Sequence, residues 1–486
     1  MTLRQPPGRV VALAVGHGRD AMSFLAVESG MSHWFDASVS DGTGACVAYV
    51  DTSGAWVAAC SPLVPAEGDA VAHRAALRFV EAARTSGRRA CFFGAEGPAH
   101  EGLSGLMIGE QPLFRPREWL RDLTKHRRLR EQLRRARAKG LRVRSLAPGE
   151  LVEGSPLRLA IERLAGDWLG SRHIEPMGFL VALEPFHCPS MHRYVVAELG
   201  GRAVGFLSAV PIGQRRAWLV EDVVRSADAP NGTTETLIVA LMREAEDSEY
   251  VTLGLTPLAG AVAWPLRVVR WVSRPLFDFE GLRAFRERLH PQRWQSVWLV
   301  YPDRVSPALP VLDSLRAFAR GSLVGFAARS FVRHPSGLPW ALALPLPLWT
   351  ASLVWLVAIH RASLLGFPRI ELALWAAFDA LLLLVLVRVA MRPRRRGLLL
   401  ATSLAVGDAA LSLAHLAWVG VGSSPLQTSL RMVATTAPIL GASLLAWATT
   451  RTVGARRFSD DVDAEIAPLP ATSISPVEGE PDSFSD

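Results

Sequence analysis

The chain has 486 residues and a net charge of +8 at pH 7, a length that allows two or three domains. Residues 459–486 carry eight acidic and no basic residues, so the rest of the chain carries +16. Such a basic body favours a polyanionic partner, either nucleic acid or an anionic membrane surface. The four cysteines lie far apart without a Cys-x-x-Cys pair, which argues against structural zinc or a disulfide framework and fits a reducing cytosol.

The first 122 residues are predicted to form one α/β unit. The start of the chain lacks the long apolar region and the cleavage site of a signal peptide. Two strands are expected across 45–59, joined by a Ser53-Gly54 turn, followed by a helix over 69–85 and a strand over 89–94. Strands and helices in the same order return after residue 140, which predicts a second unit of similar build over 123–305.

A strongly basic helix is predicted between the two units, over 125–139. Eight of its residues are Lys or Arg and only Glu131 is acidic. Leu129, Leu133 and Ala136 form a thin apolar stripe that would dock the helix on a domain. One interpretation is a solvated connecting helix. We favour contact with RNA, because these side chains could neutralise several phosphates: Lys125, Arg127, Arg128, Arg134 and Arg135.

The second unit begins with a predicted helix over 155–169 and an apolar segment over 171–186. Flanking prolines make this segment either an internal strand or a loop that lines the entry for a lipid acyl chain. Strands over 194–199 and 203–210 surround a Gly200-Gly201 pair, which predicts a hairpin.

Residues 217–260 carry the best candidate for a reaction centre. A strand over 217–220 ends in two acidic residues, a turn over 228–234 leads into an amphipathic helix, and a second strand follows over 250–255. Pro and Gly in the turn set its backbone, and Thr hydroxyls could cap the helix. The free N–H groups of a helix N-terminus bind anions or carbonyl oxygens. The alternative is a well-capped crossover without chemistry.

Several motifs in and after this stretch carry a resemblance. They are the Asp-Ala-Pro-Asn-Gly-Thr turn (228–233), Leu-Gly-Leu-x-Pro-Leu-Ala-Gly (253–260), Phe-x-Gly-Leu-Arg-x-Phe (279–285) and the closing Tyr-Pro (301–302). Together they resemble the carboxy-terminal catalytic domain of phosphatidylglycerol lysyltransferases, the bacterial aminoacyl-phosphatidylglycerol synthases. Weaker similarity extends upstream, so the resemblance covers roughly residues 10–305.

The resemblance implies a fold and a reaction. Both units would have the acetyltransferase-like (GNAT) fold in tandem. The enzyme would move an amino acid from aminoacyl-tRNA to an anionic phospholipid such as phosphatidylglycerol. A lipid hydroxyl attacks the aminoacyl ester, which requires a proton acceptor, donors for the oxyanion and an acidic pocket for the ammonium group.

The chemistry assigns roles to residues around the turn. The acidic candidates are Glu221, Asp222 and Asp228, and the polar donors are Asn231 and Thr233. Arg283 and Arg286, with Gly254 at the strand end, would hold the lipid phosphate or the terminal adenosine. For each acidic residue, a surface cap or salt bridge is the alternative. Gly232 alone does not make a glycine-rich pyrophosphate loop, so coenzyme A is disfavoured and neither a cofactor nor a metal is predicted.

The composition changes after residue 302. A basic amphipathic helix over 311–332, within a linker over 306–338, is expected at a membrane surface. Four segments within 339–452 are each about long enough to span a bilayer: 339–359, 370–387, 398–420 and 432–450. The basic loop 391–397 predicts a multi-pass protein of the inner (cytoplasmic) membrane, with both termini and the catalytic part in the cytoplasm. Residues 453–486 are predicted to be an acidic disordered tail.

Asp379, Asp408 and His415 fall inside predicted spans, where they would either mark a polar path or form hydrogen bonds between helices. Two features depart from the family. Only four spans are predicted, placed after the catalytic part, where the familiar synthases have a large translocase before it; and Cys60-Ser61-Pro62-Leu63 stands where a Gly-Asp-Pro turn is expected. Two alternative functions remain open: an acyltransferase acting on another lipid or a cell-wall precursor, and an inactive module that binds RNA or lipid.

Overall fold

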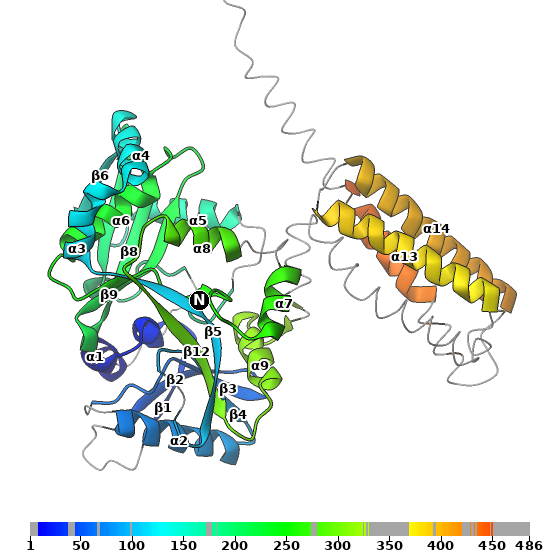
Figure 1. The fold of residues 1–486 in the computed structure, drawn as a ribbon, viewed down its shortest axis with the longest axis horizontal. Coiled ribbons are helices and arrows are strands. Elements are labelled where there is room, and N and C mark those ends of the chain that lie inside the picture. The colour runs from blue at the N-terminus through cyan, green and yellow to red at the C-terminus, as the bar shows by residue number, and fades with distance from the viewer. Residues whose placement is uncertain are drawn as a thin grey trace, which may run out of the picture. The chain divides into compact units, whose positions relative to one another are not determined.

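The computed structural model describes residues 8–36, 44–65, 69–97, 100–171, 177–181, 183–273, 279–323, 369–391 and 395–419, with shorter pieces within 325–329 and 428–450. The chain divides into two compact units, Met1–His334 and Pro335–Asp486. The first is α/β and contains all the strands among these residues (Figure 1).

The first unit is built on one mixed sheet of twelve strands. Their order is β1-β2-β3-β4-β12-β5-β10-β9-β8-β7-β6, and β11 pairs with β5. The strands are β1 Ser32–Phe35, β2 Cys46–Asp51, β3 Ala55–Ala59, β4 Arg89–Ala95, β5 Leu103–Phe114, β6 Arg142–Leu146, β7 Arg193–Leu199, β8 Arg202–Ile212, β9 Ala217–Arg225, β10 Val251–Thr252, β11 Thr256–Pro257 and β12 Arg293–Pro302. The predicted strands of the first half and the Gly200-Gly201 hairpin are confirmed.

The same arrangement of elements occurs in both halves of the sheet. Antiparallel β2 and β3 are followed by helix α2 (Asp69–Thr85), which crosses to β4 parallel to β3. Antiparallel β8 and β9 are followed by helix α6 (Thr233–Glu244), which crosses to β10 parallel to β9. This supports two units of similar build, whereas their division at residue 122 stays a prediction.

The long strands β5 and β12 join the two halves and run side by side through the middle of the unit (Figure 1). β12 comes from the end of the second half but pairs with β4 of the first half as well as with β5. The two halves therefore share backbone hydrogen bonds and form one continuous sheet.

Helices cover both faces of the second half. Along β7, Val195 and Ala197 pack in the cluster that contains α6, whereas Tyr194 and Val196 pack in the cluster that contains helix α5 (Pro156–Gly170). This alternation is what a strand buried on both faces requires.

The basic helix α4 (Arg127–Ala138) docks on α6 through the predicted stripe. Leu129, Leu133 and Ala136 are buried there, and Lys125 lies in the preceding 3-10 turn. Other α-helices among the described residues of this unit are α1 (Gly8–His17), α3 (Pro116–Asp122), α7 (Trp264–Ser273), α8 (Phe279–Glu287) and α9 (Ala308–Phe318).

Two local predictions are wrong, and one choice between alternatives is narrowed. The described part of the apolar segment, residues 177–181 and 183–186, contains no strand, which favours the loop interpretation. The strand expected over 250–255 is limited to Val251–Thr252. The strand expected to end at residue 220 continues to Arg225, so Glu221 and Asp222 lie within it.

The first part of the helix predicted to lie at a membrane surface forms α9, which packs on the first unit. Asp313 of α9 is 1% exposed and forms a two-point ion pair with Arg89 of β4, with N–O distances of 2.7 and 2.8 Å. Ser314 and Ala317 are also buried. The buried carboxylate needs the Arg89 guanidinium, so this part of the predicted linker belongs to the folded unit. Residues 319–322 contain no helix, residues 323, 325, 326 and 329 are helical, and the other positions up to 332 lie outside the described residues.

The second unit contains the helices α13 (Arg369–Met391) and α14 (Arg395–Val419) and a shorter apolar helix, Thr435–Trp447. Among the described residues one helix, Arg396–Trp418, is long and apolar enough to cross a membrane. The first predicted span and the acidic tail lie outside the described residues, so four spans stay a prediction. Asp379 and Asp408 are buried here, which leaves both of their interpretations open.

Candidate active site

A cavity of about 650 Å³ opens in the second half of the sheet. Its walls come from β9, the first turn of α6, the segment around Leu180, helix α8 and the end of α5. The cavity therefore lies beside the predicted reaction centre and brings together segments from residue 28 to residue 288.

A β-bulge places two carboxylates on this cavity. Ser208 of β8 pairs with Asp222, and the next residue, Ala209, pairs with Val220, so Glu221 is an extra residue in β9. In a regular strand, neighbouring side chains point to opposite faces, and a bulge breaks this alternation. Both carboxylates line the cavity, and Ser208 Oγ lies 3.5 Å from Glu221 Oε2 and 3.3 Å from Asp222 Oδ2.

Glu28 adds a third carboxyl group to the same wall. It is 8% exposed and accepts a hydrogen bond from the Leu180 backbone N–H at 3.1 Å. Burial, followed by the charge of Glu221, raises the pKa of Glu28 well above its ordinary value. Burial and the charge of Glu221 likewise raise the pKa of Asp222. This acidic wall, formed by Glu28, Glu221 and Asp222, is therefore suited to hold protons or a cationic group.

His192 lies behind Glu221. Its Nε2 is 2.9 Å from Glu221 Oε2, and its Nδ1 is 3.0 Å from the Cys188 carbonyl oxygen. A carbonyl only accepts, so Nδ1 carries a proton, and a second proton must lie between Nε2 and the carboxylate. The imidazole stacks on Tyr194 with ring centroids 5.4 Å apart, which holds its orientation. The pair thus stores a proton next to the cavity.

Glu28, His192 and Ser208 were not among the predicted site residues. Glu28 is distant in sequence, and His192 and Ser208 contact the carboxylates only because β8 and β9 pair in the bulged register. An apolar strand that contains a serine carries no signal for such a contact.

In the turn before α6, the backbone conformation matters more to the start of the helix than the Thr hydroxyl groups do. Gly232 has φ +100°, and a Cβ atom there would lie 2.8 Å from the Gln132 carbonyl oxygen of α4, so glycine meets both a conformational and a steric demand. Thr233 is fully buried and donates its hydroxyl to the Pro230 carbonyl at 2.7 Å. The prediction of a Thr side-chain cap is wrong, because Gly232 is the N-cap residue. Asn231 and Thr233 both line the cavity.

Asp228 is not brought to the cavity. Its side chain is 60% exposed and pairs with Arg202 and the Ser226 hydroxyl. These contacts, the Ser226 hydrogen bond first, lower the pKa of Asp228. It acts as a surface residue of the turn.

The two predicted arginines have different environments. Arg286 lines the cavity and donates to the carbonyl oxygens of Gly254 at 2.9 Å and Leu253 at 2.5 Å. Burial lowers the pKa of Arg286 to about 9, and no carboxylate of the described chain forms an ion pair with it. Gly254 (φ +69°) contributes its carbonyl to this contact. Arg283 does not line the cavity; it pairs with Glu110 at 2.6 Å.

The predicted RNA-binding side chains are all exposed. Arg134 and Arg135 both bind Glu131 of the same helix, at 2.9 and 2.8 Å, and lower its pKa to about 2. Lys125 pairs with Asp122 at 2.5 Å. Gln132 of α4 lines the cavity and donates to Glu235 at 2.8 Å, so the basic helix lies next to the cavity.

A family described as "Phosphatidylglycerol lysyltransferase, C-terminal" matches residues 11–301, which is more than half of the chain. The chain belongs to this family. The matched region contains every element that forms the cavity, and its mixed sheet agrees with the α/β prediction. Membership supports a transferase of the lysylphosphatidylglycerol synthase type.

Curated relatives are similar over part of their length. The chain is 32% identical over 263 residues to the lysylphosphatidylglycerol biosynthesis bifunctional protein LysX of Mycobacterium sp. (strain JLS), covering 48% of this chain and 22% of that protein. It is 25% identical over 152 residues to the phosphatidylglycerol lysyltransferase of Bacillus subtilis (strain 168), covering 29% and 17%. The chain thus matches about a fifth of the length of these relatives.

Two solved structures share the fold. The carboxy-terminal domain of a putative lysylphosphatidylglycerol synthetase from Agrobacterium fabrum superposes with a TM-score of 0.53 at 22% identity, covering 65% of this chain and 98% of that one. L-PGS from Bacillus licheniformis superposes with a TM-score of 0.54 at 19% identity, covering 65% and 99%. At these identities the likeness concerns the fold, and tandem GNAT domains stay a prediction.

Proposed function

We propose that the chain transfers an amino acid from aminoacyl-tRNA to a hydroxyl group of an anionic phospholipid such as phosphatidylglycerol. The observation that carries the proposal is the bulged carboxylate pair with His192 behind it, in a cavity that is also lined by the partly buried Arg286. The cavity thus offers an acidic wall for an ammonium group and a cation for a phosphate.

The acidic wall suits the amino acid. The charge of Glu221 raises the proton affinity of Glu28 and of Asp222, and an incoming ammonium group would relieve this repulsion. An amino acid with two ammonium groups relieves it most, which favours lysine, the amino acid in the names of the relatives.

The proposed reaction uses two groups that exchange protons, Asp222 and the Glu221–His192 pair. Asp222, whose pKa is raised by burial and by Glu221, accepts the proton of the lipid hydroxyl as its oxygen forms a bond to the ester carbonyl carbon. The N-terminus of α6 and Asn231 stabilise the oxyanion. The bond to the tRNA ribose oxygen then breaks, and that oxygen takes the proton shared by Glu221 and His192. The proton on Asp222 returns to the Glu221–His192 pair through the Ser208 hydroxyl, which contacts both carboxylates. Glu221 is the catalytic donor, and His192 is a positioning residue.

The lipid would enter from a membrane-facing surface that includes α7. Trp264 and Trp271 are 69% and 68% exposed and Val268 is 49% exposed, and their i, i+4, i+7 spacing places them on one helix face. α7 contains two arginines and no acidic residue, and Leu266 is buried and anchors the helix. Exposed Trp with Arg is typical of a helix at an anionic membrane interface.

The tRNA would approach along α4, whose exposed cations lie beside the cavity. We place the first unit at the cytoplasmic face of the inner membrane, where charged tRNA is found, with the second unit in the bilayer. Segments around Leu180 and Leu183 give the cavity an apolar side that suits the lipid.

The test is transfer by the purified full chain. Lysyl-tRNA labelled in the amino acid should yield labelled phosphatidylglycerol in vesicles, and ribonuclease pretreatment should abolish the product. Alanyl-tRNA should transfer more slowly. Labelling from a free amino acid with ATP, or no lipid product from any charged tRNA, would refute the proposal. Labelling of a cell-wall precursor in place of the lipid would favour the alternative acceptor.

A further inference from the structure

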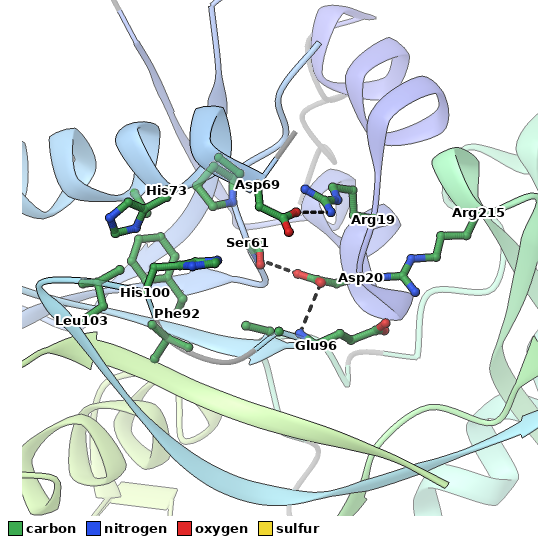
Figure 2. Close-up of a pocket in the computed structure, with 16 residues that line it drawn as sticks. Arg19, Asp20, Ser61, Asp69, His73, Phe92, Glu96, His100, Leu103 and Arg215 are labelled. Atoms are coloured by element: carbon green, nitrogen blue, oxygen red, sulfur yellow. Dashed lines mark hydrogen bonds and ion pairs between the residues drawn. The ribbon is translucent and has the colours of Figure 1, made fainter. Parts of the chain in front are cut away.

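A second cavity, of about 250 Å³, lies in the first half of the sheet (Figure 2). Its walls come from the ends of β3 and β4, the N-terminal part of α2, the start of β5 and the short 3-10 turn that contains Arg215. None of its lining residues lines the larger cavity. It is therefore separate from the proposed transfer site and is not used by the proposed reaction.

One end of this cavity carries an incompletely bonded carboxylate. Oε1 of Glu96 accepts hydrogen bonds from Gln111 Nε2 at 2.8 Å and from the Ala21 backbone N–H. Its Oε2 is buried and has no hydrogen-bond partner. The neighbouring Asp20 is occupied, because its two oxygens accept the backbone N–H groups of Ser61 at 2.7 Å and Glu96 at 3.2 Å. Glu96, which lines the cavity, thus keeps one carboxylate oxygen without a donor.

The other charged group is Arg215, whose side chain extends toward Asp20 in Figure 2. Its charge acts on Glu96 and Asp69, but no ion pair joins Arg215 to any carboxylate in the described part of the chain. The second cation, Arg19, is paired with Asp69. If Arg215 and Glu96 served only to stabilise the fold, we would expect them to form an ion pair with each other. They do not form one in the described part of the chain.

The cavity is small and partly apolar. At about 30 Å³ for each water-sized volume, a cavity of about 250 Å³ holds roughly eight non-hydrogen atoms. Ala76, Phe92 and Leu103 contribute apolar side chains to its lining. His73, whose Nδ1 is buried without a hydrogen-bond partner, and His100 close one side with ring centroids 5.2 Å apart. The described residues contain no cluster of three or more His, Cys, Asp or Glu suited to a metal ion.

We propose that this cavity binds a free α-amino acid. The ammonium group donates to Glu96 Oε2, the Arg215 guanidinium donates to the carboxylate, and the aliphatic side chain packs on Phe92 and Leu103. A zwitterion satisfies both incompletely bonded charges at once, which neither an anion nor a cation does. The site goes beyond the proposed transfer, whose amino acid arrives as an ester without a free carboxylate.

Isothermal titration calorimetry on the full chain in detergent tests this site with four ligands. Lysine and alanine should bind. Cadaverine, which lacks the carboxylate, and acetate, which lacks the ammonium group, should bind at least about tenfold more weakly than alanine, because each leaves either Arg215 or Glu96 without its partner. Glu96→Gln and Arg215→Gln should each weaken alanine binding by about tenfold or more. The matched controls Glu101→Gln and Arg216→Gln alter neighbours outside the cavity and should leave it unchanged.

The outcomes separate this site from the transfer site. Alanine binding that survives Glu221→Gln and is lost in Glu96→Gln supports the second cavity, whatever the transfer assay shows. The proposal is overturned if no amino acid binds, if acetate or cadaverine binds as tightly as alanine, or if the Glu96 and Arg215 variants bind normally. Thermal melting of each variant identifies loss of fold, and in that case the more conservative Glu96→Asp and Arg215→Lys must weaken binding in the folded protein.

Discussion

Replacing Glu221 by Gln should slow transfer while stabilising the fold. Gln keeps the size of the side chain and its hydrogen bond to His192 but removes the charge and the shared proton. Loss of a positioned acid or base lowers turnover by about 10²- to 10⁴-fold. We therefore expect a fall of this size in the single-turnover rate at saturating lipid.

The stability change follows from the neighbours. The charge of Glu221 is the second largest cause of the raised pKa of both Glu28 and Asp222. Removing it lowers both folded-state pKa values toward the unfolded ones. Each pKa unit recovered is worth about 1.4 kcal/mol at a pH above these values, and 1 kcal/mol corresponds to roughly 2–4 °C for a domain of this size. The melting temperature at pH 8 should rise by a few degrees.

Glu184→Gln is the matched control. Glu184 also raises the pKa of Glu28, but it binds Ser29 and does not line the cavity. This variant should melt slightly higher and transfer at the normal rate. If Glu221→Gln melts earlier and transfers normally, Glu221 is a structural residue and the assignment of the proton donor fails.

Four further predictions concern other parts of the first unit. Asp228→Asn should leave the transfer rate within about twofold of the wild type, since the side chain is 60% exposed and does not line the cavity; a loss of tenfold or more would return it to the active site. Replacing Arg127, Arg128, Arg134 and Arg135 by Gln should weaken tRNA binding and reduce the slope of log K against log salt by roughly two to four, and an unchanged slope would exclude α4 as the RNA contact. Trp264→Ser with Trp271→Ser should lower binding of residues 1–334 to anionic vesicles in a flotation assay, whereas Val152→Ser, at another exposed apolar residue (62%), should not; equal effects would argue against α7 as the membrane contact. Burial raises the pKa of Glu96 from 4.5 to about 7, so its contribution to stability is present below pH 4.5 and lost as the pH rises through 7. Between pH 4.5 and 8, the free energy of unfolding in urea should therefore fall by about 3 kcal/mol less for Glu96→Gln than for the wild type.

Local patterns predicted much of the secondary structure. The turn at Ser53-Gly54, the hairpin at Gly200-Gly201 and the docking stripe of α4 depend on residues that are close in sequence, and all three are confirmed. The start of α6 was also located, although Gly232, and not a Thr hydroxyl, occupies the N-cap position. The choice of cap depends on the close approach of Gln132, which comes from another helix.

The predicted reaction centre lies beside one cavity, but not all of the residues predicted for it line that cavity. Glu221, Asp222, Asn231, Thr233 and Arg286 line one cavity, as the resemblance led us to expect. Asp228 and Arg283 belong to the same motifs but bind Arg202 and Glu110 outside the cavity. A motif gives the spacing along the chain, and the direction of each side chain depends on the local backbone and its neighbours.

The sequence by itself determined the family, the basic helix and the order of strands and helices, because these depend on composition, short-range periodicity and motif spacing. Only the tertiary structure decided that β12 pairs with β4 and β5 across both halves, that α9 packs on the first unit through Asp313 and Arg89, and that Glu28 and His192 join Glu221. These contacts join residues 29 to more than 200 positions apart. Their partners are selected by strand register and by the need to neutralise buried charge, and neither leaves a mark in a local stretch of sequence.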